Sequence, residues 1–95
     1  MAWHVYVLEN PNGRRYVGYT GRPPEQRLQE HNEGLNRWTK ANRPWSLVFF
    51  ELHQSKADAQ RRERYLKTGV GREERDRLVE AARWIESAAA ERLRS

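Results

Sequence analysis

The chain contains no cysteine. This excludes disulfide bonds, thiolate zinc sites and cysteine nucleophiles. The sequence also lacks any apolar run approaching the ~20 residues that a membrane-spanning helix needs. Its first residues, Met-Ala-Trp-His-Val-Tyr, lack the charged and long apolar regions of a signal peptide. We therefore expect a cytoplasmic protein without a membrane partner.

Apolar residues are scarce, at 37% of the 95 residues, whereas 33% are charged. A chain of this length has no room for a second core, so residues 1–95 are expected to form a single domain. Four Trp, four Tyr and two Phe are more aromatics than disordered chains usually carry. The composition therefore indicates a folded domain with a small core.

Positive charge exceeds negative charge, with 18 Lys and Arg against 13 Asp and Glu and a formal net charge of +5. Such an excess favours a polyanionic partner, and nucleic acid is the commonest one. Most of the cations are arginines, which suit bidentate phosphate contacts. The same bias also arises in a GC-rich genome, so charge alone does not decide the function.

The first twenty residues predict a β-hairpin. Apolar residues alternate over Trp3–Glu9, the segment 10–13 ends in the Asn-Gly pair typical of hairpin turns, and Arg14–Thr20 forms the return strand. Tyr6 and Tyr16 then lie on adjacent antiparallel strands and can share one face.

The rest of the chain alternates helices with one further strand. The segment Trp45–Leu52 is the most apolar, so we expect it to be a central strand. The order β-β-α-β-α-α describes an α+β domain with a small sheet. The remaining expected elements are a helix over about Pro24–Glu33 ended by Gly34, a basic loop over Leu35–Pro44, a helix capped by Ser55 and ended by Gly69, and a helix over about Arg72–Leu93.

One carboxylate falls among apolar residues. Helical spacing places Glu63 in a seam where an unpaired carboxylate is unfavourable unless it is paired or bound to a metal. The simpler interpretation is a surface glutamate that pairs with Lys67 at i+4, and taken alone it is favoured. The seam comprises Ala59, Glu63, Leu66 and Val70.

Two further pairs could carry chemistry. Arg27 and His31 are spaced i, i+4 on one helix face, on a helix with few apolar side chains to bury. Tyr6 and Tyr16 share a sheet face, although strand tyrosines are usually packing residues. Read in isolation, a structural role is favoured for each pair.

Cations and aromatic rings are interleaved in the basic loop. This combination suits nucleic acid, because cations bind phosphates while aromatic rings stack on bases. A solvated loop flanked by core tryptophans explains it equally well. The candidate nucleic-acid contacts are Arg15, Arg37, Trp38, Lys40 and Arg43.

In this order, the motifs resemble those of the GIY-YIG nuclease superfamily, in particular its small stand-alone bacterial members. Val5-Tyr6-Val7 and Tyr16-Val17-Gly18 resemble the paired Gly-Ile-Tyr and Tyr-Ile-Gly signatures. Arg27-Leu28 with His31-Asn32 resembles the arginine-bearing helix, and the segment 61–67 resembles the glutamate helix. No single motif is specific to this family, but the ordered set of motifs, which extends from about residue 3 to residue 75, is specific.

The resemblance implies a fold, an activity and a set of site residues. The implied fold is a three-stranded antiparallel sheet flanked by helices. The implied activity is cleavage of nucleic acid, DNA more often than RNA, with one divalent cation, Mg²⁺ or Mn²⁺. Tyr6 and Tyr16 match the signature tyrosines, Arg27 the catalytic arginine, Glu63 the metal ligand, and His31 a histidine of many members.

The residue types suit phosphodiester hydrolysis. Mg²⁺ prefers oxygen ligands and keeps several waters, so a single carboxylate can hold it. Arg27 would bind phosphate oxygens, and a tyrosine would activate water with His31 as helper or competitor. His4 stands where the first signature has glycine, a position at which other members also vary. Two departures concern the level of activity: Tyr19 stands where repair members carry lysine, and no residue after Glu63 matches the family's later asparagine.

Two alternatives stay open beside the endonuclease. One is a catalytically weak nucleic-acid-binding module that keeps the fold. The other is an interaction protein whose C-terminal helix, with Trp84 beside its apolar stripe, docks a partner or a second copy. That stripe comprises Leu78, Ala82, Ile85, Ala89 and Leu93. For the endonuclease, we expect Tyr6, Tyr16, Arg27, His31 and Glu63 to converge on one concave surface.

Overall fold

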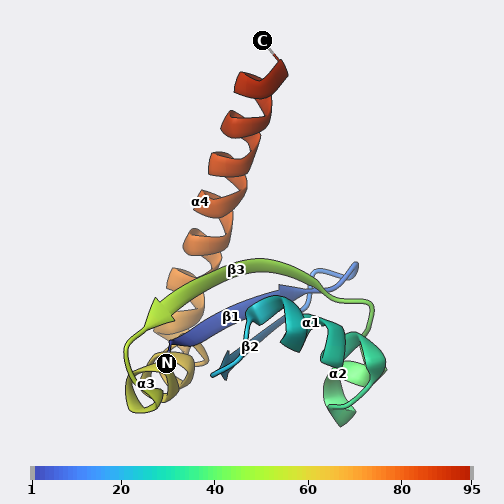
Figure 1. Cartoon of the computed structure of the whole chain (residues 1–95), viewed down its shortest axis with the longest axis vertical. Coiled ribbons are helices and arrows are strands. Elements are labelled where there is room, and N and C mark those ends of the chain that lie inside the picture. The colour runs from blue at the N-terminus through green and yellow to red at the C-terminus, as the bar shows by residue number, and fades with distance from the viewer. Residues whose placement is uncertain (1, 95) are drawn as a thin grey trace.

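Three strands form one antiparallel sheet in the computed structural model, which describes the backbone of residues 2–94 and the side chains of residues 2–86 and 88. The strands are β1 (Trp3–Glu9), β2 (Arg15–Thr20) and β3 (Ser46–His53), in the order β2-β1-β3 (Figure 1). The predicted α+β class with a three-stranded antiparallel sheet is confirmed.

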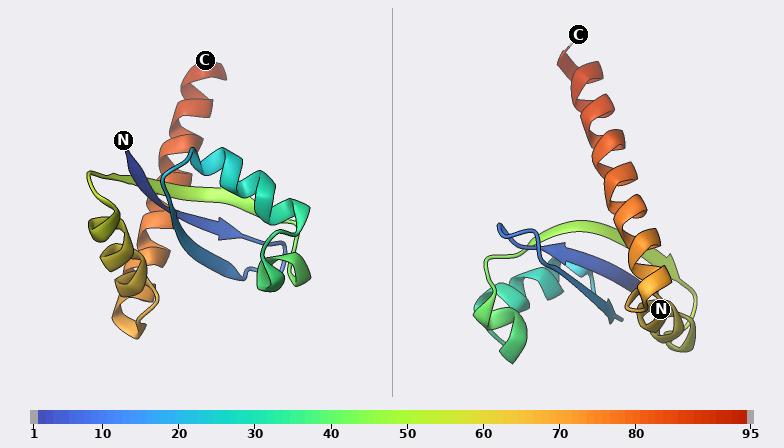
Figure 2. Two further views of the ribbon diagram at one scale, coloured as in Figure 1. Left: turned by 60° about the horizontal axis from the view of Figure 1, so that its bottom comes forward. Right: turned by 180° about the vertical axis from the view of Figure 1, so that it is seen from behind.

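Four helices flank the sheet. The hydrophobic residues form two clusters, one on each face of the sheet. Helices α3 and α4 pack on one face, and α1 and α2 lie on the other, as the two views of Figure 2 show. The helices are α1 (Pro24–Glu33), α2 (Arg37–Ala41), α3 (Lys56–Leu66) and α4 (Gly69–Arg94).

The central strand is β1, because its side chains are buried on both faces. Val5, Tyr6, Val7 and Leu8 are all buried, the pattern of a strand covered by two layers. The expectation that Trp45–Leu52 forms a central strand was wrong. The corresponding strand, β3, lies at the sheet edge and leaves the alternate side chains Phe50 and Leu52 exposed.

The predicted basic loop contains a short helix, α2, which corrects the sequence analysis. Its first turn is capped by Asn36, whose side-chain oxygen accepts from the Thr39 amide at 3.1 Å. Thr39 is fully buried, so the helix is anchored to the body by a polar residue. Apolar periodicity could not reveal such a helix.

The boundary between the last two helices also differs from expectation. Helix α3 ends at Leu66, and Gly69 begins α4 instead of ending the preceding helix. The Thr68 hydroxyl accepts from the Gly71 amide at 3.1 Å and so caps the new helix. Val70 therefore belongs to α4, where it is exposed, and the predicted seam does not extend to it.

Helix α4 packs only through its first part and then projects beyond the sheet (Figure 1). Val79 is completely buried against the sheet, a contact that the predicted stripe did not include. Leu78 and Ala82 are half-buried, whereas Ile85 is exposed. The other stripe members, Ala89 and Leu93, lie outside the described side chains.

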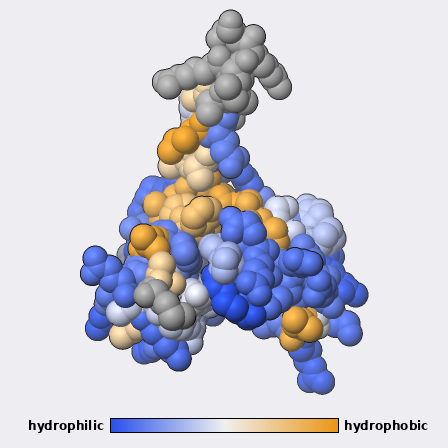
Figure 3. Space-filling model, viewed as in Figure 1, coloured by the Kyte–Doolittle hydropathy of each residue, from blue (hydrophilic) through white to orange (hydrophobic). Residues whose placement is uncertain are grey.

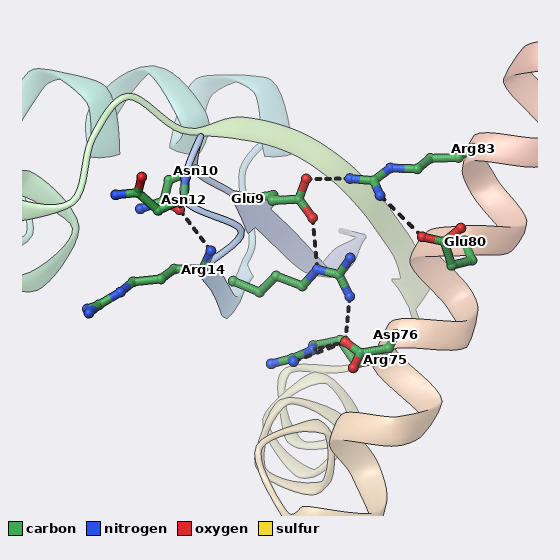
Figure 4. A network of polar contacts seen from close by, with 9 residues as sticks. Glu9, Asn10, Asn12, Arg14, Arg75, Asp76, Glu80 and Arg83 are labelled. Carbon is green, nitrogen blue, oxygen red and sulfur yellow. Dashed lines mark hydrogen bonds and ion pairs between the residues drawn. The ribbon is translucent and has the colours of Figure 1, made fainter.

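A network of ion pairs joins the hairpin to α4 (Figure 4). The Arg15 Nε donates to Glu9 at 2.9 Å, and its Nη1 pairs with Asp76 on α4. Arg83, two turns further along α4, pairs with the other oxygen of Glu9. Single surface pairs contribute little to stability, but shared partners define how α4 lies against the hairpin.

No helix between residues 2 and 94 combines the length and hydropathy needed to cross a membrane.

Candidate active site

The two tyrosines share one sheet face, as the hairpin predicted. Tyr6 pairs with Gly18 and Leu8 with Tyr16, which places the tyrosines diagonally on that face with ring centroids 6.4 Å apart. A Cβ at Gly18 would lie 2.5 Å from the Tyr6 Cζ and Oη atoms, so only glycine leaves room for this ring. Gly18 thus belongs to the site, a role visible in the Tyr-Val-Gly motif but not assigned from it.

Helix α1 places His31 against Tyr6 in the interior. The His31 Nε2 atom lies 2.8 Å from the Tyr6 Oη atom, and its Nδ1 atom lies 2.9 Å from the Thr39 Oγ1 atom. The Thr39 hydroxyl donates its one proton to the Asn36 carbonyl at 3.2 Å, so it must accept from Nδ1–H. This assigns the tautomer, and Tyr6 therefore donates to an unprotonated Nε2.

Both members of the Tyr6–His31 pair are neutral at pH 7. Burial and, to a smaller extent, the positive charge of Arg27 together lower the pKa of His31 to about 4. Burial raises the pKa of Tyr6 to about 12, with Tyr16 adding to the effect and Arg27 opposing it. The pair therefore holds a proton donor and a proton acceptor in contact without net charge.

Acid should destabilise the protein through His31. Its pKa is lower in the folded than in the unfolded state, so its contribution is fully present above pH 6.5 and is lost as pH falls through 4. The free energy of unfolding should fall by up to about 3 kcal/mol across this window. Denaturant unfolding at a series of pH values measures the loss.

The control for this prediction is a second histidine. His53→Gln, which removes a histidine paired with Glu51 at 3.0 Å, should retain the acid-dependent loss. His31→Gln should remove this component, because the variant has no imidazole to protonate on unfolding. An unchanged pH profile in His31→Gln would show that the loss comes from other groups.

Arg27 lies one turn before His31 on α1 and is held by a second residue. Its Nη1 pairs with Glu30, which also accepts from both terminal nitrogens of Arg22, at 2.7 and 2.9 Å. Arg27, Glu30 and His31 line one small pocket of about 90 Å³. Glu30 therefore positions the guanidinium, a role that only the i, i+3 spacing from Arg27 could have indicated.

Glu63 approaches the tyrosines from the opposite side. Helix α3 packs against β1 and β2, and the half-buried Glu63 Oε1 atom lies 3.0 Å from the Lys67 Nζ atom. That ammonium lies 5.6 Å from the centroid of the Tyr16 ring. The negative charge of Glu63 also adds to the raised pKa of Tyr6. The predicted i+4 pairing is present, and it lies beside the tyrosine pair.

The donor chemistry at Glu63 fits a hydrated hard cation. Among residues 2–94, no three His, Asp or Glu side chains gather into a preformed metal cluster. Mg²⁺ keeps several waters and is commonly held by one or two carboxylates, whereas structural zinc needs four protein ligands. A single half-buried carboxylate beside a cleft therefore suits Mg²⁺ or Mn²⁺ better than zinc.

The predicted nucleic-acid contacts divide into two groups. Trp38 stacks on Tyr16, with ring centroids 6.0 Å apart and an angle of 28° between the planes. Arg37 and Lys40 are exposed on the same short helix as Trp38. Arg15, in contrast, is engaged by Glu9 and Asp76 in the network described above.

Asn32 and Trp45 support the site by joining α1 to the start of β3. The Asn32 side chain donates to the Trp45 carbonyl at 3.0 Å and accepts from the Trp45 amide at 2.7 Å, which ties α1 to the start of β3. The exposed Arg43 donates to the Asn32 carbonyl at 3.2 Å. The Trp45 indole is buried and donates to the Thr39 carbonyl at 2.8 Å, so Trp45 is a core residue.

The sequence matches known proteins over most of its length. Residues 2–76 match the model of the GIY-YIG catalytic domain. The chain is similar to the UPF0213 protein SH2523 of Staphylococcus haemolyticus, with 38% identity covering 84% of this chain and 98% of that protein. It is also similar to the UPF0213 protein CPE1444 of Clostridium perfringens, with 37% identity covering 67% of this chain and 69% of that protein.

A solved structure agrees with these matches. The solution NMR structure of the UPF0213 protein BH0048 from Bacillus halodurans superposes with a TM-score of 0.50 at 31% identity, covering 82% of this chain and 85% of that one. Sequence and structure thus point to the same small bacterial relatives, and the resemblance of the motifs is confirmed. The chain belongs to the GIY-YIG family, a family of nuclease domains that act on nucleic acid.

Proposed function

We propose that this protein is a divalent-metal-dependent endonuclease that hydrolyses phosphodiester bonds in nucleic acid, with DNA as the favoured substrate. The observation that carries the proposal is the meeting of an arginine and a carboxylate at one tyrosine pair. Arg27 approaches Tyr6 from α1, and Glu63 approaches from α3. A module that only binds nucleic acid has no use for a carboxylate at this position.

The roles follow from the contacts. Glu63 would hold the cation, which when bound neutralises charge on the phosphate and on the leaving oxygen. Arg27, oriented by Glu30, binds the non-bridging phosphate oxygens. Tyr6 Oη takes a proton from the attacking water as its own proton passes along the 2.8 Å contact to His31 Nε2. Tyr16, which stacks on Trp38, shields the reacting phosphate from solvent on that side.

A cleavage screen tests this proposal. Linear, branched and single-stranded DNA and the corresponding RNA are incubated with the protein and Mg²⁺, Mn²⁺ or a chelator. We expect cutting of at least one DNA substrate with a metal and none with the chelator. Cutting that continues in the chelator would exclude the metal mechanism, and no cutting of any substrate would favour the binding module.

Helix α2 and its flanks should supply the phosphate contacts. Replacing Arg37, Lys40 and Arg43 together with Gln should flatten the dependence of log affinity on log salt concentration by roughly two to three units, since each phosphate contact contributes about one. Binding is measured without metal across a salt series. The matched control replaces three exposed arginines on α3 and α4: Arg61, Arg64 and Arg77. An equal change in both triple variants would place the binding surface elsewhere.

Exposed apolar side chains on α4 support a second, compatible prediction. Trp84 and Ile85 are 76% and 70% exposed. Apolar surface gathers where α4 leaves the body (Figure 3), and a groove of about 340 Å³ lies between β3 and α4. Every copy carries both features, so two copies related by a twofold axis can cover each other's apolar surface. Self-association through α4 stays a prediction, and a measurement of the mass in solution tests it. The single-domain organisation of residues 1–95 and the cytoplasmic location also stay predictions.

A further inference from the structure

The cleft beside Glu63 and Tyr16 adjoins the candidate active site, and the function proposed above assigns no ligand to it. It lies between β2 and the junction of α3 with α4, and its volume is about 330 Å³. Sites for small ligands measure roughly 300–1,000 Å³, so the cleft has room for a ligand fragment. Its lining contains no acidic side chain among the described residues.

One wall of the cleft is aromatic. Tyr16 and Trp38 line it, and their rings stack on each other. Trp38 is 45% exposed, so a large part of the indole is free to contact a ligand. Stacking of a nucleobase on an aromatic side chain is favourable for every base, because each base has a π face.

The opposite rim is basic, but its four cations are not equivalent. Arg15 and Arg75 both pair with Asp76, which offsets their charge. Arg72 forms no ion pair with any side chain that the structure describes, so it is available to an anion. Lys67 pairs with Glu63, and a cation taken up by that carboxylate would release the ammonium toward the cleft.

The cleft and the pocket of Arg27 share a lining residue. Tyr16 belongs to the tyrosine pair and also lines the cleft, and Asn36 lines both the cleft and the pocket beside Arg27 and His31. A strand whose phosphate lies at Arg27 therefore has its neighbouring nucleotide close to the cleft. An aromatic wall facing a basic rim matches the two halves of a nucleotide, the base and the phosphate.

We propose that this cleft is a nucleotide subsite next to the scissile phosphate. The base stacks on Trp38, and Lys67 and Arg72 bind the phosphate of the same nucleotide. The position of the subsite beside a phosphate that is cut rests on the proposed endonuclease function, but the recognition of a nucleotide by these side chains does not.

The test is an NMR titration of the ¹⁵N-labelled protein without metal. The probes are deoxyadenosine monophosphate and inorganic phosphate. We expect the nucleotide to shift the Trp38 indole signal and the amides around Arg72, and phosphate to shift only the latter. The nucleotide should bind on the order of tenfold more tightly than phosphate, and Trp38→Ala should remove this advantage.

Substitutions of Arg72 and Lys67, compared with a control at Arg77, locate the phosphate contact. Arg72→Gln should weaken binding of the nucleotide by about tenfold, the effect of one charged hydrogen bond. Lys67→Gln should weaken it more when Glu63 is also replaced by Gln than in the parent, since the ammonium is then free of its partner. Arg77→Gln removes an equal charge from an exposed position of α4 outside the cleft, and should change affinity less than twofold. Equal effects of Arg72→Gln and Arg77→Gln would overturn the subsite.

A dinucleotide decides where the subsite lies along the strand. It should bind more tightly than the mononucleotide, and Arg27→Ala should remove the difference. Equal affinities in the parent would overturn the placement beside the scissile phosphate. No cleavage is needed for any of these measurements, so the two proposals fail separately. Glu63-dependent cutting without nucleotide shifts in the cleft would remove only the subsite, and nucleotide binding by a protein that never cuts would remove only the nuclease function.

Discussion

Glu63→Gln should reduce metal-dependent cleavage by roughly 10³-fold or more without weakening nucleic-acid binding, because a catalytic metal contributes several kcal/mol to stabilisation of the transition state. The substitution preserves the size of the side chain and removes the charge that would hold the cation. It also frees Lys67 from its 3.0 Å ion pair, so the positive charge facing the substrate increases.

The measurement pairs single-turnover cleavage in Mg²⁺ and Mn²⁺ with binding in a chelator. The control is Glu73→Gln, which neutralises an exposed glutamate on α4. Cleavage by Glu73→Gln should match the parent. If Glu63→Gln cuts as fast as the parent in saturating metal, Glu63 has no part in the mechanism.

Arg27→Ala should slow cleavage by about 10²–10³-fold at saturating protein, the usual effect of losing one preorganised donor to a developing charge. Its affinity for nucleic acid should fall only modestly, because several other cations hold the backbone. Arg27→Lys should restore part of the rate, since an ammonium supplies charge but lacks the planar two-point contact. Single-turnover rates separate chemistry from binding.

Arg22 offers a matched control for Arg27. Both arginines pair with Glu30, but the Arg22 side chain is 52% exposed and the Arg27 side chain 24%. Arg22→Ala should therefore leave the saturated rate within a few-fold of the parent. A parental rate for Arg27→Ala would make Arg27 a binding residue and overturn its assigned role.

Local sequence patterns predicted the hairpin and its consequences well. The Asn-Gly turn sets the register of β1 and β2, and the register alone places Tyr6 and Tyr16 on one face. Helical spacing likewise predicted the i, i+4 contact of Glu63 with Lys67. In both cases the partners are connected by a short, regular piece of chain.

The parts that were missed depend on packing between distant segments. Thr39 was placed in a loop, yet its burial against His31 and Trp45 is what anchors α2. The total apolar content of β3 did not reveal that it lies at an edge, because a sheet position depends on which layers cover each face. Val79 was not predicted as a core residue, because apolar residues in the projecting part of α4 led the predicted stripe along a different line of the helix.

The hydrogen-bonded chain from Tyr6 through His31 and Thr39 to the Asn36 carbonyl has a direction, since each member donates to the next. A proton that leaves Tyr6 along this chain creates an imidazolium, and Arg27 already disfavours positive charge there. Under the proposed function, an anionic phosphate at Arg27 would offset that repulsion. Ionisation of Tyr6 would then be coupled to the arrival of substrate, and Tyr6 would stay protonated between encounters.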